Sequence, residues 1–153
     1  MALHVTFDTG ALIALSSPSA SKRNAMQAIA NRVSERNGGF KREWIAIPAN
    51  AVAEWWRTPR RGQIDRRASI LGLGTVHLVD EKVAKAAGEL LTRVARADGE
   101  QARVRLTVDA TVMVIAAAHG PNLYTQDPDD MLRLKELGSF DVRVFDVSEL
   151  AGS

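Results

Sequence analysis

The chain has 153 residues, of which 46% are hydrophobic and 25% are charged, and its formal net charge at pH 7 is +2. This size and apolar content suit one globular domain over residues 1–153. The absence of cysteine excludes disulfides and thiolate zinc sites, and it favours the cytoplasm. We expect neither a signal peptide nor a membrane span, because no Lys or Arg precedes Asp8 and the longest apolar run covers only residues 110–118.

The N-terminal third is predicted to alternate strands with helices. A β-prone run at residues 3–7 ends at Asp8, and Gly10 is expected to permit a sharp turn into an apolar segment. Helical spacing follows through residues 26–33 and is expected to stop at two consecutive glycines. A second strand is predicted at residues 44–47.

The middle of the chain is predicted to contain two helices and a strand. Asn50 is the expected N-cap of a helix that carries Glu54 and two tryptophans, Trp55 and Trp56. Adjacent helical residues point roughly 100° apart, so we expect one tryptophan in the core and the other at the surface. A short helix at residues 64–71 and a third strand at 76–79 follow.

The last half begins with Asp80, the expected N-cap of a long amphipathic helix that closes at Asp98 and Gly99. Residues 108–119 are apolar nearly all round, which indicates a buried helix, yet Asp109 lies in its first turn. The positive end of the helix dipole makes an anion tolerable there. A strand at residues 123–125, a helix through residue 137 and a strand at 142–145 complete the prediction.

Alternating strands and helices predict a three-layer α/β/α sandwich around a parallel sheet of about five strands. Ligands of such sheets bind beyond the carboxyl ends of the strands, where the strand order reverses. With the order 3-2-1-4-5, Asp8 and Asp127 lie at the two neighbouring strand ends. Asp109 and Glu54 approach from flanking helices. We therefore expect these four acids to converge on one cleft.

Converging carboxylates repel one another in a half-buried cleft, and a divalent cation relieves that repulsion. An all-oxygen set with no Cys and only three scattered His favours Mg²⁺ or Mn²⁺ over zinc or copper. Such a cation can present a polarised water to a phosphodiester and offset charge in the transition state. The composition therefore favours metal-assisted phosphodiester hydrolysis.

Four segments, taken in order, resemble the PIN-domain nucleases, and most closely the VapC-like toxins of bacterial toxin–antitoxin pairs. They are Phe7-Asp8-Thr9-Gly10, Ala53-Glu54, Val108-Asp109-Ala110 and the run from Tyr124 to Asp130. The resemblance covers nearly the whole chain and implies the compact α/β/α PIN fold. It implies an Mg²⁺- or Mn²⁺-dependent endoribonuclease, a cytoplasmic toxin that is restrained by a cognate antitoxin and forms a homodimer.

By the same resemblance, Asp8, Glu54, Asp109 and Asp127 form the catalytic, metal-binding cluster. The last loop also offers Asp129 and Asp130. We prefer Asp127 as the ligand, with Asp130 next, because Asp129 points away on the first helical turn.

Residues 57–67 contain five arginines and a single acid, the densest positive charge in the chain. Because an acidic site repels RNA, we expect Arg57, Arg60 and Arg61 to contact RNA or a partner protein, together with Thr125 at a strand end. An antitoxin groove formed by this segment and an exposed tryptophan is the competing interpretation. A solvated arginine face is the ordinary one.

Taken singly, each acid also has an ordinary explanation: Asp8 as a turn acid, Asp127 as an N-cap and Glu54 as a solvated helix residue.

Three other functions also remain open. An aspartyl-phosphate phosphotransferase-like domain would usually carry a second acid at position 10, which is Gly10. A phospho-receiver domain would carry a lysine after the fifth strand, where the sequence has Asp146-Val147-Ser148. The third is a PIN-like binding module without catalysis.

Overall fold

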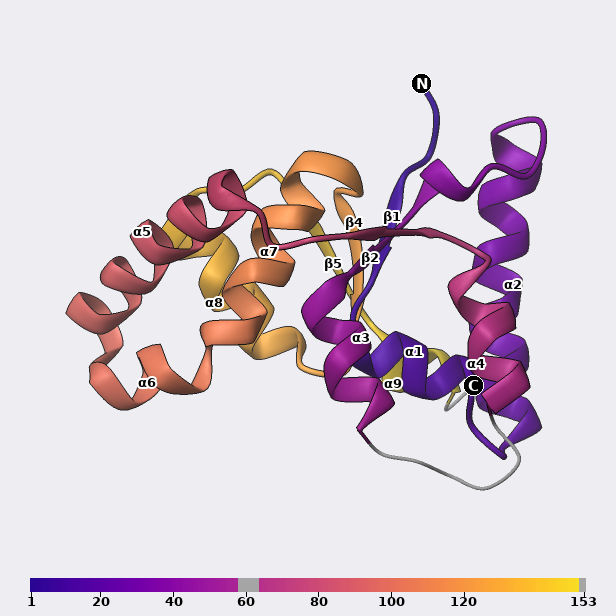
Figure 1. The fold of residues 1–153 in the computed structure, drawn as a ribbon, viewed down its shortest axis with the longest axis horizontal. Helices are drawn as coiled ribbons and strands as arrows, with labels where there is room; N and C mark the ends of the chain where they lie inside the picture. The colour runs from indigo at the N-terminus through magenta and orange to yellow at the C-terminus, as the bar shows by residue number, and fades with distance from the viewer. Residues whose placement is uncertain (58–63, 152–153) are drawn as a thin grey trace.

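The structure is a computed structural model that describes residues 1–57 and 64–151 (Figure 1). The strands are β1 (Val5–Phe7), β2 (Ile45–Pro48), β3 (Thr75–His77), β4 (Asn122–Thr125) and β5 (Arg143–Asp146). The helices are α1 (Thr9–Leu15), α2 (Ala20–Arg36), α3 (Ala49–Trp56), α4 (Ile64–Leu71), α5 (Glu81–Asp98), α6 (Glu100–Arg105), α7 (Thr107–His119), α8 (Pro128–Gly138) and α9 (Val147–Ala151), with a 3₁₀ turn, η1 (Arg42–Trp44).

The five strands form one parallel sheet in the order β3-β2-β1-β4-β5, which confirms the predicted order. In the register, Val5 of β1 lies opposite Ile45 of β2, and Phe7 lies opposite Tyr124 of β4. The strand order reverses between β1 and β4, so the carboxyl ends of these two strands flank the crevice in which such sheets bind ligands. The architecture is the predicted α/β/α sandwich.

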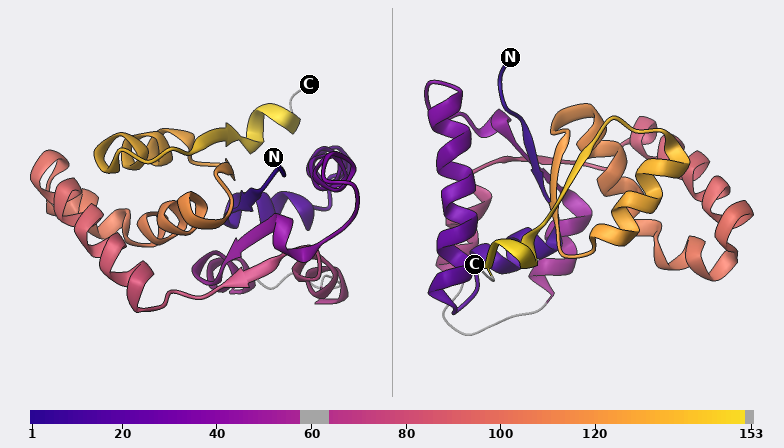
Figure 2. Two further views of the ribbon diagram at one scale, coloured as in Figure 1. Left: turned by 90° about the horizontal axis from the view of Figure 1, so that it is seen from above. Right: turned by 180° about the vertical axis from the view of Figure 1, so that it is seen from behind.

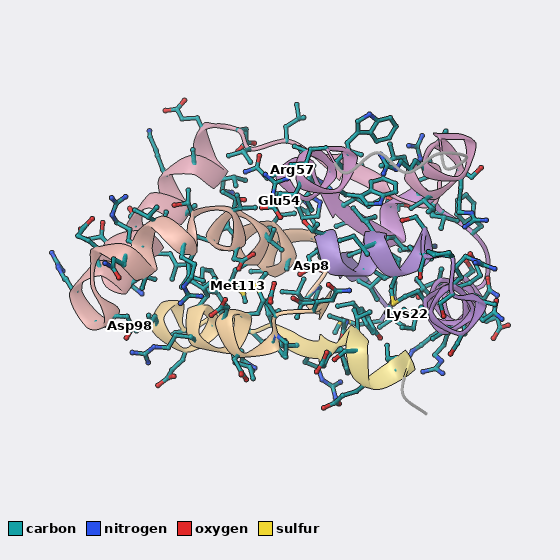
Figure 3. The ribbon with its side chains drawn as sticks, turned by 90° about the horizontal axis from the view of Figure 1, so that it is seen from below. Asp8, Lys22, Glu54, Arg57, Asp98 and Met113 are labelled. Atoms are coloured by element: carbon teal, nitrogen blue, oxygen red, sulfur yellow. The ribbon has the colours of Figure 1, made fainter. Side chains whose placement is uncertain are left out.

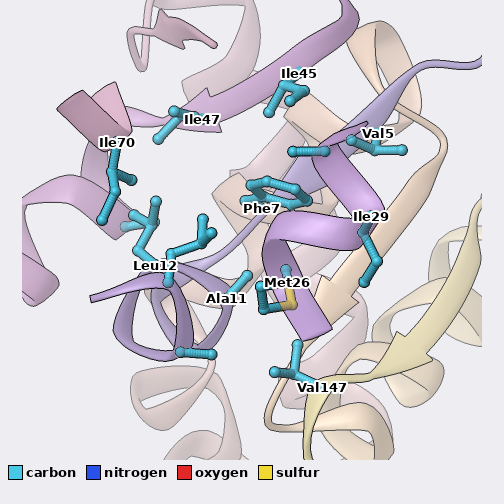
Figure 4. Packing of buried hydrophobic residues seen from close by; sticks show 14 of the residues in the cluster. Val5, Phe7, Ala11, Leu12, Met26, Ile29, Ile45, Ile47, Ile70 and Val147 are labelled. Atoms are coloured by element: carbon cyan, nitrogen blue, oxygen red, sulfur yellow. The ribbon is translucent and has the colours of Figure 1, made fainter. Parts of the chain in front are cut away.

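Successive side chains of a strand point to opposite faces of the sheet, so the hydrophobic core has two parts, one on each face. Val5 and Phe7 face α1 and α2, in a cluster that also contains Leu12 and Met26 (Figure 4). Residues on the opposite face, such as Leu123, pack with α5, α7 and α8. Figure 2 accordingly shows the helices of residues 81–138 gathered in one half of the molecule, and α1 and α2 in the other. The sheet is therefore covered on both faces, as a buried parallel sheet requires.

Most helix boundaries follow the predicted signals. The Asp80 carboxylate accepts the Val83 N–H at 2.8 Å and caps α5, and Gly99 ends this helix with a φ of 96°. Three helices are absent from the sequence prediction. They are α1, where only an apolar segment is expected, α6, between Gly99 and the buried helix α7, and the short α9.

The predicted N-cap of α3 is wrong. Pro48 occupies the N-cap position, and Asn50 lies within the first turn. The Asn50 amide instead donates to the Thr111 hydroxyl of α7 at 3.2 Å. A proline suits this end of a helix, because the missing N–H removes no intrahelical hydrogen bond.

The tryptophan pair of α3 is divided as predicted. Trp55 is 1% exposed and its ring N–H donates to the Ser16 hydroxyl at 3.0 Å, whereas Trp56 is 44% exposed. Trp55 therefore fixes α3 against α1.

Among the helices of the described residues, none has the length and apolar character needed to cross a bilayer.

Candidate functional site

The sheet brings two of the predicted acids to neighbouring strand ends. Asp8 follows β1 directly, and its backbone N–H donates to the Tyr124 carbonyl of β4 at 3.3 Å. Asp127 follows the same strand β4 by two residues. Figure 3 shows Asp8 near the middle of the molecule, close to Glu54 and far from Asp98 at the end of α5.

The Asp8 carboxylate is 5% exposed, and its Oδ1 accepts the Ala11 N–H at 3.2 Å. It therefore caps α1, whereas the ordinary explanation of this residue made it a turn acid, and this cap is buried. Burial raises the pKa of Asp8 to about 6, against the lowering effect of hydrogen bonds from Thr125, Ala11 and Gly10. The negative charge of Asp127 adds to the rise in the pKa. The ionised form of Asp8 is thus disfavoured by its surroundings.

Thr125, at the end of β4, joins the two strand-end acids. Its hydroxyl donates to the Asp8 carboxylate and accepts the Asp127 N–H at 2.9 Å. The side chain is 0% exposed. This burial is at odds with the predicted contact to RNA or a partner, because no surface of the side chain reaches solvent. Thr125 instead holds the two acids in a fixed relation.

Asp109 lies in the first turn of α7, as predicted, and is half-buried. The pKa of Asp109 is raised to about 7, chiefly by burial and to a smaller extent by the charges of Asp8, Asp127, Asp130 and Glu54, in that order of effect. Four other acids therefore act on one carboxyl group. The charges of Asp8, Glu54 and Asp127 thus all act on Asp109, and the joint role of the four acids as a metal-binding cluster stays a prediction.

Glu54, on α3, is half-buried beside the start of α1. Its Oε2 accepts a hydrogen bond from the Thr9 hydroxyl at 3.1 Å, and the same hydroxyl lies 3.4 Å from the Ala51 carbonyl oxygen. Thr9 immediately follows Asp8. Thr9 therefore links the two acids: its backbone is bonded to Asp8, and its hydroxyl donates to the Glu54 carboxylate.

The three acids of the final loop differ in their exposure and hydrogen bonding. Asp127 occupies the N-cap position of α8 without a side-chain capping bond, so capping does not explain it. Asp129 is exposed. Asp130 is half-buried and accepts a hydrogen bond from Arg105 Nη1 at 2.7 Å. The sequence alone did not indicate Arg105, because a lone arginine at the end of a short helix carries no local signal.

Gly10 has a different role from the predicted turn. It lies inside α1 and does not have a positive φ. A Cβ at this position would lie 2.4 Å from Cγ of Gln126 and 2.8 Å from its backbone N. Gly10 therefore allows the start of α1 to approach the loop that carries Asp127, which brings the two acids together.

The oxygen-only donor set matches the chemistry of Mg²⁺ or Mn²⁺. Within residues 1–57 and 64–151, no group of three or more His, Asp or Glu side chains is arranged to hold a metal ion as it stands. Mg²⁺ does not need such a cage, since it commonly binds through one or two carboxylates, waters and substrate phosphates. The pKa values of Asp8 and Asp109 are raised chiefly by burial and to a smaller extent by neighbouring carboxylates, and a bound cation would stabilise the ionised forms against both effects. The carboxylates of the candidate site are therefore chemically suited to bind Mg²⁺ or Mn²⁺.

Only part of the predicted arginine segment can be placed. Arg57, the exposed C-cap of α3, lies near Glu54 (Figure 3). Arg60 and Arg61 lie outside the described residues. Arg67, by contrast, is 5% exposed and stacks at 5.4 Å from the Trp55 ring centre, so part of the segment belongs to the packed interior.

The strand order and the covering helices define a PIN-like fold. Among solved structures, the chain is similar to FitAB bound to an IR36 DNA fragment, with a TM-score of 0.65 and 19% sequence identity over 94% of each chain. FitAB is a PIN-domain toxin–antitoxin protein. No family model and no curated protein matches the sequence. At this identity the likeness establishes the fold, and the activity has to be argued from the site.

Proposed function

We propose that this protein is a metal-dependent endoribonuclease of the PIN-domain toxin type, which cleaves RNA phosphodiesters and is inhibited by a cognate antitoxin. One observation carries the proposal: four acids from three separate segments act on the half-buried carboxyl of Asp109 at the carboxyl edge of the sheet. Structural packing alone gives no reason to gather like charges, because each one lowers the stability of the others' ionised forms. The likeness to a toxin–antitoxin protein supports the same assignment.

The acids of the cluster have two parts in this proposal. Asp8, Asp109 and Asp127 are the proposed cation ligands, with Glu54 at the border of the cleft, where Thr9 orients its carboxylate. Mg²⁺ or Mn²⁺, when bound, supplies Lewis acidity that polarises a water and offsets charge on the phosphodiester. Thr125 and Ala11 hold Asp8 through hydrogen bonds, which reduces the reorganisation needed on cation binding.

The proposed antitoxin rests on the same likeness, and the proposed homodimer rests on the resemblance of the sequence to PIN-domain toxins. FitAB is a toxin–antitoxin protein, and its structure contains a DNA fragment. We propose an antitoxin as the inhibitor of this chain and a homodimer as its assembly. The exposed Trp56 and Arg57, at the end of the helix that carries Glu54, are suited to contact an antitoxin that covers the cleft.

Cleavage of RNA by the purified chain tests the proposal. We expect cleavage in Mg²⁺ or Mn²⁺ that stops when the cation is chelated, and a loss of at least about 100-fold in Asp8→Asn and Asp109→Asn, since a lost ligand removes several kcal/mol of transition-state stabilisation. Asp141→Asn is the matched control, because Asp141 is an exposed acid just before β5, at the opposite edge of the sheet.

Three results would contradict the proposal: full activity in either site variant, activity that survives chelation, or cleavage of DNA in preference to RNA of the same sequence. The other classes predict different outcomes in the same samples. A phospho-receiver or aspartyl-phosphate enzyme would incorporate phosphate at an aspartate and leave RNA intact. A non-catalytic module would bind RNA or the antitoxin without cleaving either.

A further inference from the structure

An ion pair between α6 and α8 includes an acid of the candidate site. Arg105, the last residue of α6, donates from Nη1 to Asp130 Oδ2 in the first turn of α8, at 2.7 Å. Other ion pairs of α5, α6 and α8, such as Arg133 with Asp98 and Arg103 with Glu100, join acids outside the cluster. Arg105 therefore places a positive charge beside an acid of the candidate site.

The charge of Arg105 acts on more than its hydrogen-bond partner. The hydrogen bond to Asp130 raises the pKa of Arg105, and the charges of Asp130, Asp109 and Asp127 raise it further. The guanidinium therefore lies in the field of two proposed cation ligands. Arg105 ends α6, a helix that the sequence does not predict, and lies at the junction of α6 with α7.

The side chain of Arg105 is 59% exposed although it is held at one end. A guanidinium has five N–H donors in a planar fork, and the bond to Asp130 uses Nη1. Further donors in this fork can reach an incoming ligand from solvent. A phosphodiester, with two non-bridging oxygens, is the ligand whose geometry matches such a fork.

We propose that Arg105 is a substrate-contact residue that binds an RNA phosphate beside the acidic cluster, and that Asp130 is its positioning residue and not a cation ligand. This inference rests on the proposed nuclease function and names the residue that offsets repulsion between the cleft and RNA. It also separates the roles of the acids in the final loop. Asp127 faces the cation, and Asp130 orients the arginine.

The proposal predicts two effects of opposite sign when the charge of Arg105 is removed. RNA affinity falls, because an RNA phosphate no longer has the guanidinium to bind. Affinity for a divalent cation rises, because a positive charge near Asp109 and Asp127 no longer repels it. A purely structural role for Arg105 predicts that both affinities fall together, since a distorted cleft binds both ligands less well.

The test uses the full-length chain and two separate titrations. Binding of a fluorescein-labelled single-stranded RNA is measured in chelator over a range of salt, and binding of Mn²⁺ is measured by calorimetry without RNA. For Arg105→Gln we expect RNA affinity to fall about tenfold and the log–log salt slope to flatten by about 0.7, the value for one phosphate of a single strand. We expect Mn²⁺ affinity to rise about threefold, a modest effect because the side chain is largely solvated.

Three further variants sharpen the experiment. Arg103→Gln is the control, because Arg103 lies on the same helix and pairs with Glu100; both affinities should stay at the wild-type values. Arg105→Lys keeps the charge and loses the fork, so Mn²⁺ affinity should return to the wild-type value while RNA affinity recovers only in part. Asp130→Asn should weaken RNA binding and reduce Mn²⁺ affinity much less than Asp8→Asn does.

An unchanged RNA affinity in Arg105→Gln, or a fall in its Mn²⁺ affinity, would overturn the role of Arg105. A loss of Mn²⁺ affinity in Asp130→Asn as large as that in Asp8→Asn would overturn the role of Asp130. Failure of the nuclease proposal looks different, because the wild-type chain itself would then neither bind Mn²⁺ at the cluster nor cleave RNA.

Discussion

The Asn50 amide donates to the Thr111 hydroxyl at 3.2 Å, and that hydroxyl donates in turn to the Val108 carbonyl at 2.6 Å. The bond joins α3 to α7, the two helices that carry Glu54 and Asp109. Asn50 precedes Glu54 by one helical turn, so its side chain fixes the relative position of two acids that the sequence leaves far apart.

Asn50→Ala therefore tests positioning across the cleft. We expect the free energy of unfolding to fall by about 1 kcal/mol, the usual net value of one hydrogen bond. RNA cleavage should fall about tenfold in a folded sample, because small displacements of reacting groups are costly. Gln27→Ala is the control, since Gln27 makes an exposed bond of the same kind to Asn31 on α2. Equal activity in the two variants would show that the bond does not position the acids.

The second prediction concerns stabilisation by the cation. Because a ligand that binds only the native state stabilises it, Mg²⁺ or Mn²⁺ at ten times its Kd should add about 1.4 kcal/mol to the free energy of unfolding. The melting temperature should rise less in Asp8→Asn and Asp109→Asn, and as in the wild type in Asp141→Asn. An identical metal response in all four proteins would place the cation elsewhere.

The third prediction is a fall in stability as the pH rises without metal. Asp8 has a pKa of about 6 in the folded chain and an ordinary value of 3.8. The native state therefore binds the proton more tightly, and the free energy of unfolding decreases between about pH 4 and pH 6 and then levels off. The effect of Asp109 extends this window to about pH 7.

For Asp8 the difference in pKa is about two units, which corresponds to about 3 kcal/mol at most. Asp8→Asn should flatten the slope and be more stable than the wild type at pH 8 in chelator, because Asn retains an oxygen that accepts the Ala11 N–H. Urea unfolding between pH 4.5 and 8 measures this. A wild-type stability that rises across that range would contradict the prediction.

The fourth prediction concerns Arg60 and Arg61, which follow the helix of Glu54 in the sequence but lie outside the described residues. If they bind RNA, changing both to Ala should weaken RNA binding and flatten its log–log salt slope by about 0.7 for each phosphate that is no longer neutralised. The Mn²⁺ affinity should not change. Loss of antitoxin binding with an unaltered salt slope would assign these arginines to the partner surface.

The sequence determined the five strands, most of the longer helices and their order. Strand runs, the cap at Asp80, the glycine at position 99 and the apolar helix before His119 are local signals, and each appears in the structure within two residues of its predicted place or with its predicted role. The parallel sheet followed from the alternation of strands and helices. Once that order is given, Asp8 and Asp127 belong at neighbouring strand ends.

Only the tertiary structure decided how the acids are held. Thr125 bridges Asp8 and Asp127 because the register of β1 and β4 brings Phe7 beside Tyr124. The close approach at Gly10 and the pairing of Arg105 with Asp130 depend on segments more than 20 residues apart in the chain. Local periodicity reports which face of an element is apolar, but contacts between distant side chains depend on register and packing, which no local pattern contains.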